Sequence, residues 1–189
     1  MKLCVFQGTF NPIHNGHIKM AEHVLANYDF DKLLIIPAFK PPHKDYDETL
    51  TPHRLEMAKI AIKKISKLEV SDIEYKIDRT SYTYLTIMEL YELYNVEGKI
   101  HFIIGTDAFK NIDSWYKAEE LKKLIKFIVF KRENETEFCI NNAEYEYTTM
   151  PLCDISSTEI RDKIKAGKEI TGLVSEEVER YIERNKLYK

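Results

Sequence analysis

Short apolar runs alternate with helical patterns through most of the chain, and this alternation constrains the fold more than any other feature. In chain order, the sequence predicts a strand at 3–6, a helix at 17–28, a strand at 33–36, a helix from Thr51, a strand at 68–70, a helix at 83–94, a strand at 100–104, a helix at 118–124 and a strand at 127–130. Because crossovers between parallel strands carry helices, the pattern predicts an α/β fold in which a doubly wound parallel sheet has helices on both faces.

The rest of the chain completes one predicted domain spanning residues 1–189. Thr51 is expected to cap its helix, with Pro52 at the first helical position. The elements expected after residue 133 are an irregular segment at 133–142, a weak strand at 145–150 and helices at 156–166 and 175–185, so that residues 155–189 form a small C-terminal helical extension. No repeat and no Gly/Ser-rich linker divides the chain.

Charge and cysteine content exclude several classes of protein. Twenty-eight Lys and Arg against 31 Asp and Glu give a formal charge of −3, so no global basic field attracts nucleic acid and any phosphate site must be local. The apolar run at the N-terminus is too short for a signal peptide or a membrane span. Cys4, Cys139 and Cys153 lack metal-ligand spacing, so we expect buried thiols that are kept reduced in the cytoplasm. The sequence leaves a homo-oligomer open.

Residues 8–17 occupy the first strand-to-helix crossover, which in open α/β sheets lies in the ligand crevice. Gly8 and Gly16 permit close approach of a ligand, and the following helix offers free N–H groups to an anion. His14 and His17 are three residues apart, so both rings lie on one side of the first turn and can reach one phosphate. The structural alternative is a pair of histidines that only hydrogen-bond the loop.

Residues 155–161 form a second polar helix start. Ser156 and Glu159 alone have the spacing of a capping box, which is a purely structural feature. Ser157, Thr158 and Arg161 exceed what a cap requires. They add hydroxyls and a guanidinium at a helix N-terminus, and this set of groups is typical of an anion site.

Both segments carry a resemblance to one known family. The run Gly8-Thr9-Phe10-Asn11-Pro12-Ile13-His14-Asn15-Gly16-His17 resembles the HxGH signature of the nucleotidyltransferase superfamily, in the form found in bacterial nicotinate-nucleotide adenylyltransferases. The run Ile155-Ser156-Ser157-Thr158-Glu159-Ile160-Arg161 is similar to the second signature of that family, ISSTxIR. The resemblance extends through Gly172-Leu173-Val174 to Leu187-Tyr188 and implies a Rossmann-like fold.

The resemblance also implies an activity and a set of site residues. The activity is transfer of AMP from ATP to nicotinate mononucleotide, which gives nicotinate adenine dinucleotide and pyrophosphate in NAD biosynthesis. The implied catalytic residues are His14, His17 and Arg161. The implied ATP-binding residues are Gly8, Thr9, Phe10, Gly16, His17, Ile155, Ser156, Ser157, Thr158 and Arg161. The implied mononucleotide-binding residues are Lys44, Tyr82, Thr83, Asp107, Trp115 and Arg132.

Several of these residues have simpler structural interpretations. Trp115, the only tryptophan, suits stacking on a pyridine ring, but an isolated tryptophan more often serves packing. Asp107 has the alternative of capping the turn after the preceding strand, and Lys44 and Arg132 have the alternative of being solvated charges. Two positions depart from the family pattern: Gln7 replaces a usual Gly, and Ile77 replaces a usual Arg, with Arg79 two residues later.

The implied reaction needs alignment more than a base. A phosphate monoester is largely a dianion at neutral pH, so the enzyme must hold two anions together and stabilise charge on the α- and β-phosphates. The sequence has no carboxylate cluster for a protein-held metal, so Mg²⁺ is expected to arrive with ATP. The alternatives are nicotinamide mononucleotide as substrate, a phosphopantetheine adenylyltransferase, or a non-catalytic nucleotide sensor.

Overall fold

The computed structural model describes residues 1–42, 47–131, 135–150 and 155–189. Its strands are β1 (Leu3–Gly8), β2 (Lys32–Pro37), β3 (Leu68–Val70), β4 (Ile100–Gly105), β5 (Ile125–Lys131) and β6 (Glu144–Thr149). Its α-helices are α1 (Asn15–Asn27), α2 (Thr51–Ile62), α3 (Thr83–Leu93), α4 (Thr106–Phe109), α5 (Ala118–Leu124), α6 (Ser157–Lys165) and α7 (Glu176–Arg184), and three 3₁₀ turns, η1 (Glu48–Leu50), η2 (Ile73–Tyr75) and η3 (Ile112–Ser114), complete the set.

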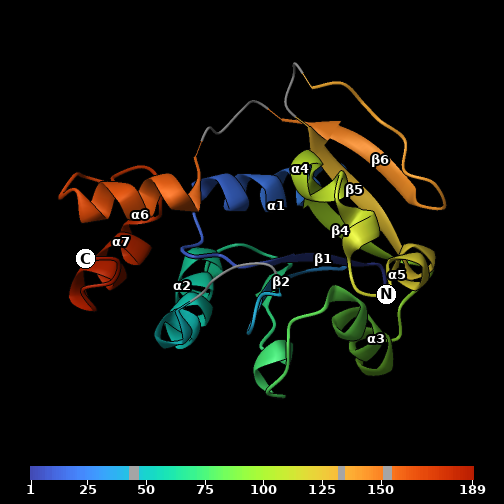
Figure 1. Ribbon diagram of the computed structural model, residues 1–189, viewed down its shortest axis with the longest axis horizontal. Coiled ribbons are helices and arrows are strands. Elements are labelled where there is room, and N and C mark those ends of the chain that lie inside the picture. Colours follow the sequence, from blue (N-terminus) through green and yellow to red (C-terminus); the bar gives the residue numbers. More distant parts are fainter. Residues whose placement is uncertain (43–46, 132–134, 151–154) are drawn as a thin grey trace.

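The six strands form one sheet in the order β3-β2-β1-β4-β5-β6, and every neighbouring pair is parallel (Figure 1). The chain runs outward from β1 to β3 and then returns to β4 on the other side of β1. The direction of winding therefore reverses between β1 and β4, and ligands of open α/β sheets bind outside the carboxyl ends of such a pair of strands. The parallel α/β fold expected from the sequence is confirmed.

Alternate residues of the inner strands β1, β2, β4 and β5 enter two separate cores, one on each face of the sheet. Cys4 and Phe6 of β1 pack with α1, α2, α6 and α7, whereas Leu3 and Val5 pack with α3, α4 and α5. Because the inner strands are covered on both sides, most of their consecutive residues are apolar, and the uninterrupted runs in the sequence reflect this requirement. The edge strands β3 and β6 instead carry exposed glutamates, such as Glu69 and Glu144. In Figure 1, α1 and α6 lie on one side of the sheet and α3 on the other.

Two local expectations were wrong. Leu50, not Thr51, precedes the first turn of α2, because η1 and its Asp47 cap lead directly into the helix; Thr51 is buried inside the first turn. Cys139 is exposed, because it lies in the irregular stretch before β6, while Cys4 is buried as expected and Cys153 lies outside the described residues.

The C-terminal helices match their predicted signals closely. The Ser156 hydroxyl caps α6 by accepting a hydrogen bond from the Glu159 N–H at 3.1 Å. Glu159 does not complete a capping box, since its carboxylate lies 3.3 Å from Lys163, one turn further along. Gly167 stops the helix with φ of +65°, a conformation that favours glycine. Within the described residues, no helix combines the length and the apolar character needed to cross a bilayer.

Candidate active site

The first part of the site is the start of α1, where the two histidines stack. His14 precedes the first helical residue, and the centroids of its ring and the His17 ring are 3.6 Å apart, with 30° between the planes. The His14 N–H donates to Nδ1 of His17 at 3.2 Å. Because Nδ1 of His17 accepts this hydrogen bond, its neutral ring carries the proton on Nε2 and offers an N–H donor from that side.

His14 is buried, with 7% of its surface exposed. Burial lowers the pKa of His14 to about 4, so its imidazole is neutral near pH 7. Its Nδ1 is buried without a hydrogen-bond partner among the described residues. The His14 side chain also faces the His17 N–H in a capping-box arrangement, so the two histidines together close the start of α1 beside the cavity.

The second part of the site is the start of α6, which is fastened to the crossover before α1. The Ser157 hydroxyl donates to the Pro12 carbonyl at 2.9 Å, and Arg161 donates from Nη1 to the Asn11 carbonyl at 2.8 Å. A second guanidinium nitrogen of Arg161 lies 3.2 Å from the Thr158 hydroxyl. Two helix N-termini and a guanidinium therefore converge, and this arrangement favours anions.

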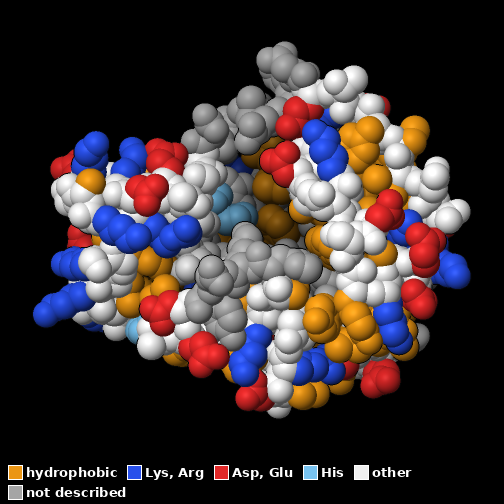
Figure 2. All heavy atoms as spheres, viewed as in Figure 1, with side chains coloured by type: hydrophobic (Ala, Val, Ile, Leu, Met, Phe, Trp, Pro, Cys, Tyr) orange, Lys and Arg blue, Asp and Glu red, His pale blue; other side chains and the backbone are white. Residues whose placement is uncertain are grey.

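A cavity of about 680 Å³ joins these two helix starts. Figure 2 shows a hollow at the centre of the molecular face, with hydrophobic side chains inside it and histidine at its edge. All ten predicted ATP-binding residues line this cavity: Gly8, Thr9, Phe10, Gly16, His17, Ile155, Ser156, Ser157, Thr158 and Arg161. A Cβ on Gly8 would lie 3.0 Å from the Phe10 ring, so any larger residue there would have to displace that ring by a few tenths of an ångström.

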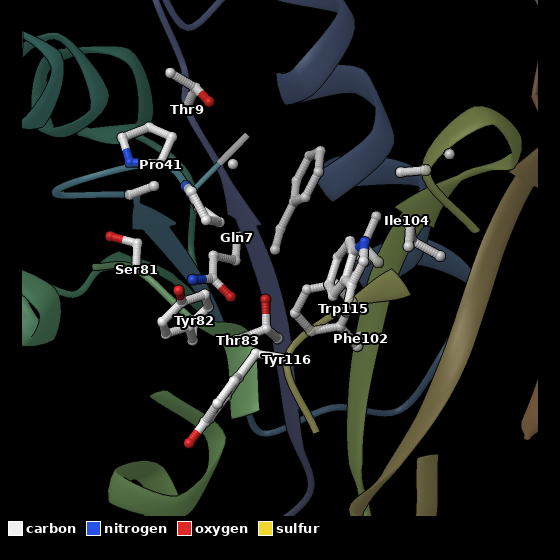
Figure 3. A pocket seen from close by; sticks show the side chains of 17 residues that line it. Gln7, Thr9, Pro41, Ser81, Tyr82, Thr83, Phe102, Ile104, Trp115 and Tyr116 are labelled. Carbon is white, nitrogen blue, oxygen red and sulfur yellow. The ribbon is translucent and has the colours of Figure 1, made fainter. Parts of the chain in front are cut away.

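A second cavity, of about 290 Å³, is lined by aromatic side chains (Figure 3). Trp115 stands edge-on to Phe102, with 6.2 Å between ring centroids and 82° between planes, and its remaining surface lines the cavity. Tyr82 stacks on Tyr116 at 4.6 Å. Helix α3 begins at this cavity with Thr83, and its N-terminus has no side-chain cap.

The two cavities share a wall made by the ends of β1 and β4. The residues common to both linings are Phe6, Gln7, Gly8, Thr9, Gly105 and Ala108. Gly8 is the last residue of β1 and Gly105 the last of β4, so the wall lies at the point where the strand order reverses. The two cavities therefore adjoin at the carboxyl ends of β1 and β4.

Gln7, the first departure from the family pattern, is held by a buried carboxylate. Its Nε2 donates to Oε1 of Glu74, which also accepts from the Thr86 hydroxyl at 2.6 Å, while Oε2 of Glu74 accepts from the Phe39 N–H at 3.0 Å. In Figure 3, Gln7 projects from β1 between Ser81 and Tyr82 on one side and Trp115 on the other. The extra side chain is therefore part of the pocket wall.

Arg54 of α2 organises the loops beneath the site, a role that the sequence did not reveal. It is 1% exposed, and its guanidinium donates to the Thr9 carbonyl at 2.9 Å, the Phe39 carbonyl at 3.0 Å and the Ala38 carbonyl. These carbonyls belong to the segments that leave β1 and β2. One buried cation therefore fixes both loops, and its hydrogen bonds to carbonyls compensate for burial of the charge.

The structure brings together three of the six predicted mononucleotide residues. Tyr82, Thr83 and Trp115 line the smaller cavity, whereas Asp107 is exposed and lines only the larger one, because it belongs to the first turn of α4. Lys44 and Arg132 lie outside the described residues. Arg79 pairs with Glu89 of α3 at 2.5 Å, so its charge is directed to that helix.

A doubly wound parallel sheet, with two adjoining cavities at its reversal point and two helix N-termini facing one of them, defines a nucleotide-binding α/β protein. The chain belongs to the cytidylyltransferase-like family, whose model matches residues 5–163.

Relatives within this family cover the chain almost completely. A probable nicotinate-nucleotide adenylyltransferase of Fusobacterium nucleatum is 40% identical over 97% of this chain and 98% of its own length. A probable nicotinate-nucleotide adenylyltransferase of Caldicellulosiruptor saccharolyticus is also 40% identical, over the full length of both chains.

Solved structures share the fold over nearly the whole chain. The Plasmodium falciparum nicotinic acid mononucleotide adenylyltransferase complexed with NaAD has a TM-score of 0.80 at 24% identity and covers 99% of this chain and 97% of its own. The same Plasmodium falciparum protein complexed with APC has a TM-score of 0.76 at 22% identity, covering 99% and 96%. The Rossmann-like fold expected from the sequence is thereby confirmed.

Proposed function

We propose that this chain transfers the AMP moiety of ATP to nicotinate mononucleotide, releasing pyrophosphate and forming nicotinate adenine dinucleotide for NAD biosynthesis. The single observation that carries the proposal is the pair of adjoining cavities. One is lined by His14, His17 and Arg161, and the other by Trp115 and Tyr82. The full-length relatives named for this activity support the same assignment.

In this proposal the triphosphate lies across the starts of α1 and α6. The N–H groups of both helices, Nε2 of His17 and the guanidinium of Arg161 stabilise charge that builds on the α- and β-phosphate oxygens. The attacking group is a 5′-phosphate oxygen of the mononucleotide, which bonds to the α-phosphorus as the bond to the leaving pyrophosphate breaks. Gly8 and Gly105 line both cavities, which supports a pose in which the two phosphates lie side by side, and this alignment would be the main contribution of the protein.

The choice of the acid over the amide is proposed from the start of α3. This helix has eleven residues, begins at the smaller cavity and has no side-chain cap, so its first N–H groups favour a negative charge. Nζ of Lys117 lies 4.8 Å from the Tyr84 ring centroid and 5.8 Å from that of Tyr116, which places a cation at the same rim. Both features are more favourable to a carboxylate than to a carboxamide.

A magnesium ion fits the site only as a companion of ATP. Asp107 is the one carboxylate among the described residues of the larger cavity, and the part of the chain that the structure describes contains no group of three His, Cys, Asp or Glu arranged for a metal. Phosphate oxygens and water would supply the remaining ligands that Mg²⁺ prefers. The ion would neutralise phosphate charge when bound.

The decisive test is product identification. The protein is incubated with Mg-ATP and, in separate reactions, with nicotinate mononucleotide, nicotinamide mononucleotide and phosphopantetheine, and the products are identified by mass. We expect nicotinate adenine dinucleotide as the main product. Turnover only of phosphopantetheine would overturn the proposed substrate, and ATP binding without pyrophosphate release under any acceptor would indicate a nucleotide sensor.

A further inference from the structure

The segment that follows α7 reaches back to the phosphate-binding crossover. The Tyr188 hydroxyl donates to Oδ1 of Asn11 at 2.6 Å, across 177 residues of sequence. Asn11 lines the larger cavity, and its own carbonyl accepts the hydrogen bond from Arg161 at 2.8 Å. Tyr188 therefore holds the side chain of Asn11, and Arg161 holds its backbone carbonyl beside the proposed triphosphate site.

The conformation of Tyr188 indicates that this contact is built rather than incidental. The residue is 9% exposed and has φ of +64°, a left-handed conformation that a bulky side chain rarely adopts. Such strain persists only where surrounding contacts fix it, and it is concentrated at functional sites. Burial raises the pKa of Tyr188, although the nearby charges of Arg161 and Arg54 oppose this rise. The hydroxyl therefore stays protonated and remains a donor.

Other residues hydrogen-bond the backbone on both sides of Asn11, whereas the Asn11 side chain accepts its hydrogen bond from Tyr188. Asn15, the first residue of α1, donates from its N–H to the Leu173 carbonyl and from Nδ2 to the Gly172 carbonyl, both at 2.9 Å. Ser157 holds the Pro12 carbonyl. The Asn11 side chain is oriented by the Tyr188 hydroxyl.

We infer that Tyr188 is a positioning residue for adenylyl transfer. It fixes Asn11, and through Asn11 it sets the place of Arg161 and of the crossover that cradles the triphosphate. Tyr188 does not itself line either cavity among the residues that the structure describes. The expected effect on kcat rests on the proposed function, whereas the expected effect on the order of the crossover does not depend on it.

The test uses Tyr188→Phe, which removes the hydroxyl and keeps the buried ring. We expect kcat to fall at least about tenfold, because small displacements of aligned reactants are costly, while KM for the mononucleotide stays unchanged. Tyr181→Phe is the matched control, since it removes a tyrosine hydroxyl of α7 that contacts Nδ1 of His53 in α2 at 2.9 Å and lines neither cavity. Amide hydrogen exchange over residues 9–16 should quicken in Tyr188→Phe and not in Tyr181→Phe.

A double-mutant cycle with Asn11→Ala tests whether the hydroxyl of Tyr188 acts on kcat through Asn11. If Tyr188 acts through Asn11, the double variant is no slower than the worse single variant. Additive losses, or wild-type kcat and wild-type exchange in Tyr188→Phe, would overturn the inference. If the wild-type protein makes no nicotinate adenine dinucleotide, the proposed function fails, and the exchange measurements still decide whether Tyr188 orders the crossover.

Discussion

The ring of His14 stacks on the ring of His17 at 3.6 Å, and the backbone N–H of His14 donates to Nδ1 of the same neighbour. His14 therefore both packs against the His17 ring and determines that the neutral ring carries its proton on Nε2. Because burial keeps His14 neutral, the pair can stabilise phosphate charge through N–H donors without placing two cations in contact. Substitutions of His14 and His17 are therefore expected to affect different properties of the protein.

Replacement of His17 by alanine should lower kcat at least about a hundredfold, the usual consequence of losing one donor to a transition-state oxyanion. Steady-state pyrophosphate release measures the effect, and circular dichroism confirms the fold. His23→Gln is the control, because His23 lies on the same helix and contacts Thr148 at 3.0 Å, away from both cavities. Near-normal turnover of His17→Ala would remove His17 from the mechanism.

His14 should make stability depend on pH. Its folded pKa of about 4 lies below the ordinary value of 6.5, so below pH 6.5 the unfolded chain gains a proton that the folded chain does not. The free energy of unfolding should therefore be full above pH 6.5 and fall by up to about 3 kcal/mol as pH decreases to 4. Urea unfolding at several pH values measures the slope, and His14→Gln should flatten it by that amount. An equal slope in both proteins would contradict the assignment.

Arg54→Met should destabilise the protein strongly. It leaves the carbonyls of Thr9, Ala38 and Phe39 without their donor, and each buried unsatisfied group costs about 1–3 kcal/mol, so we expect a loss of at least about 3 kcal/mol in urea unfolding. Arg180→Met, which breaks an exposed pair with Glu176 at 3.2 Å, should cost under about 1 kcal/mol. Similar losses for the two variants would disprove the organising role of Arg54.

Trp115→Ala should raise KM for the mononucleotide about tenfold and leave KM for ATP nearly unchanged, because stacking on an aromatic side chain contributes about 1–3 kcal/mol per ring. Trp115→Phe should recover part of the loss, since it retains an aromatic face. Initial rates at varied concentrations of each substrate separate the two constants. A rise confined to the KM for ATP would place the pyridine ring elsewhere.

The parts of the structure that follow local rules could be predicted from the sequence. The strand runs, the Ser156 cap and the left-handed Gly167 each depend on residues within one turn or one strand. The pairing of His14 with His17 follows from their spacing and from the helix that begins between them. The displaced cap of α2 was missed because the turn at Asp47 competes locally with Thr51, and both have good capping side chains.

The contacts that give the site its shape could not be predicted, because they join residues that are distant in the sequence. Gln7 and Glu74 are 67 residues apart, and Asn11 and Tyr188 are 177 apart. Gln7 alone is simply a departure from a family pattern, and only the fold reveals the buried carboxylate that holds it. Arg54 likewise has no local signal that distinguishes a buried clamp on carbonyls from a solvated charge.

The wall shared by the two cavities has a consequence for ligands that are larger than either substrate. A molecule that joins a pyridine-like ring to an adenylate by a short bridge would fill both chambers at once, and it would lose its overall translational freedom once rather than twice. Once one half of this molecule is bound in its cavity, the bridge keeps the other half at a high effective concentration near the second cavity. Such a bridge would cross the end of β1 at Gly8, the last residue of the strand, which lines both cavities.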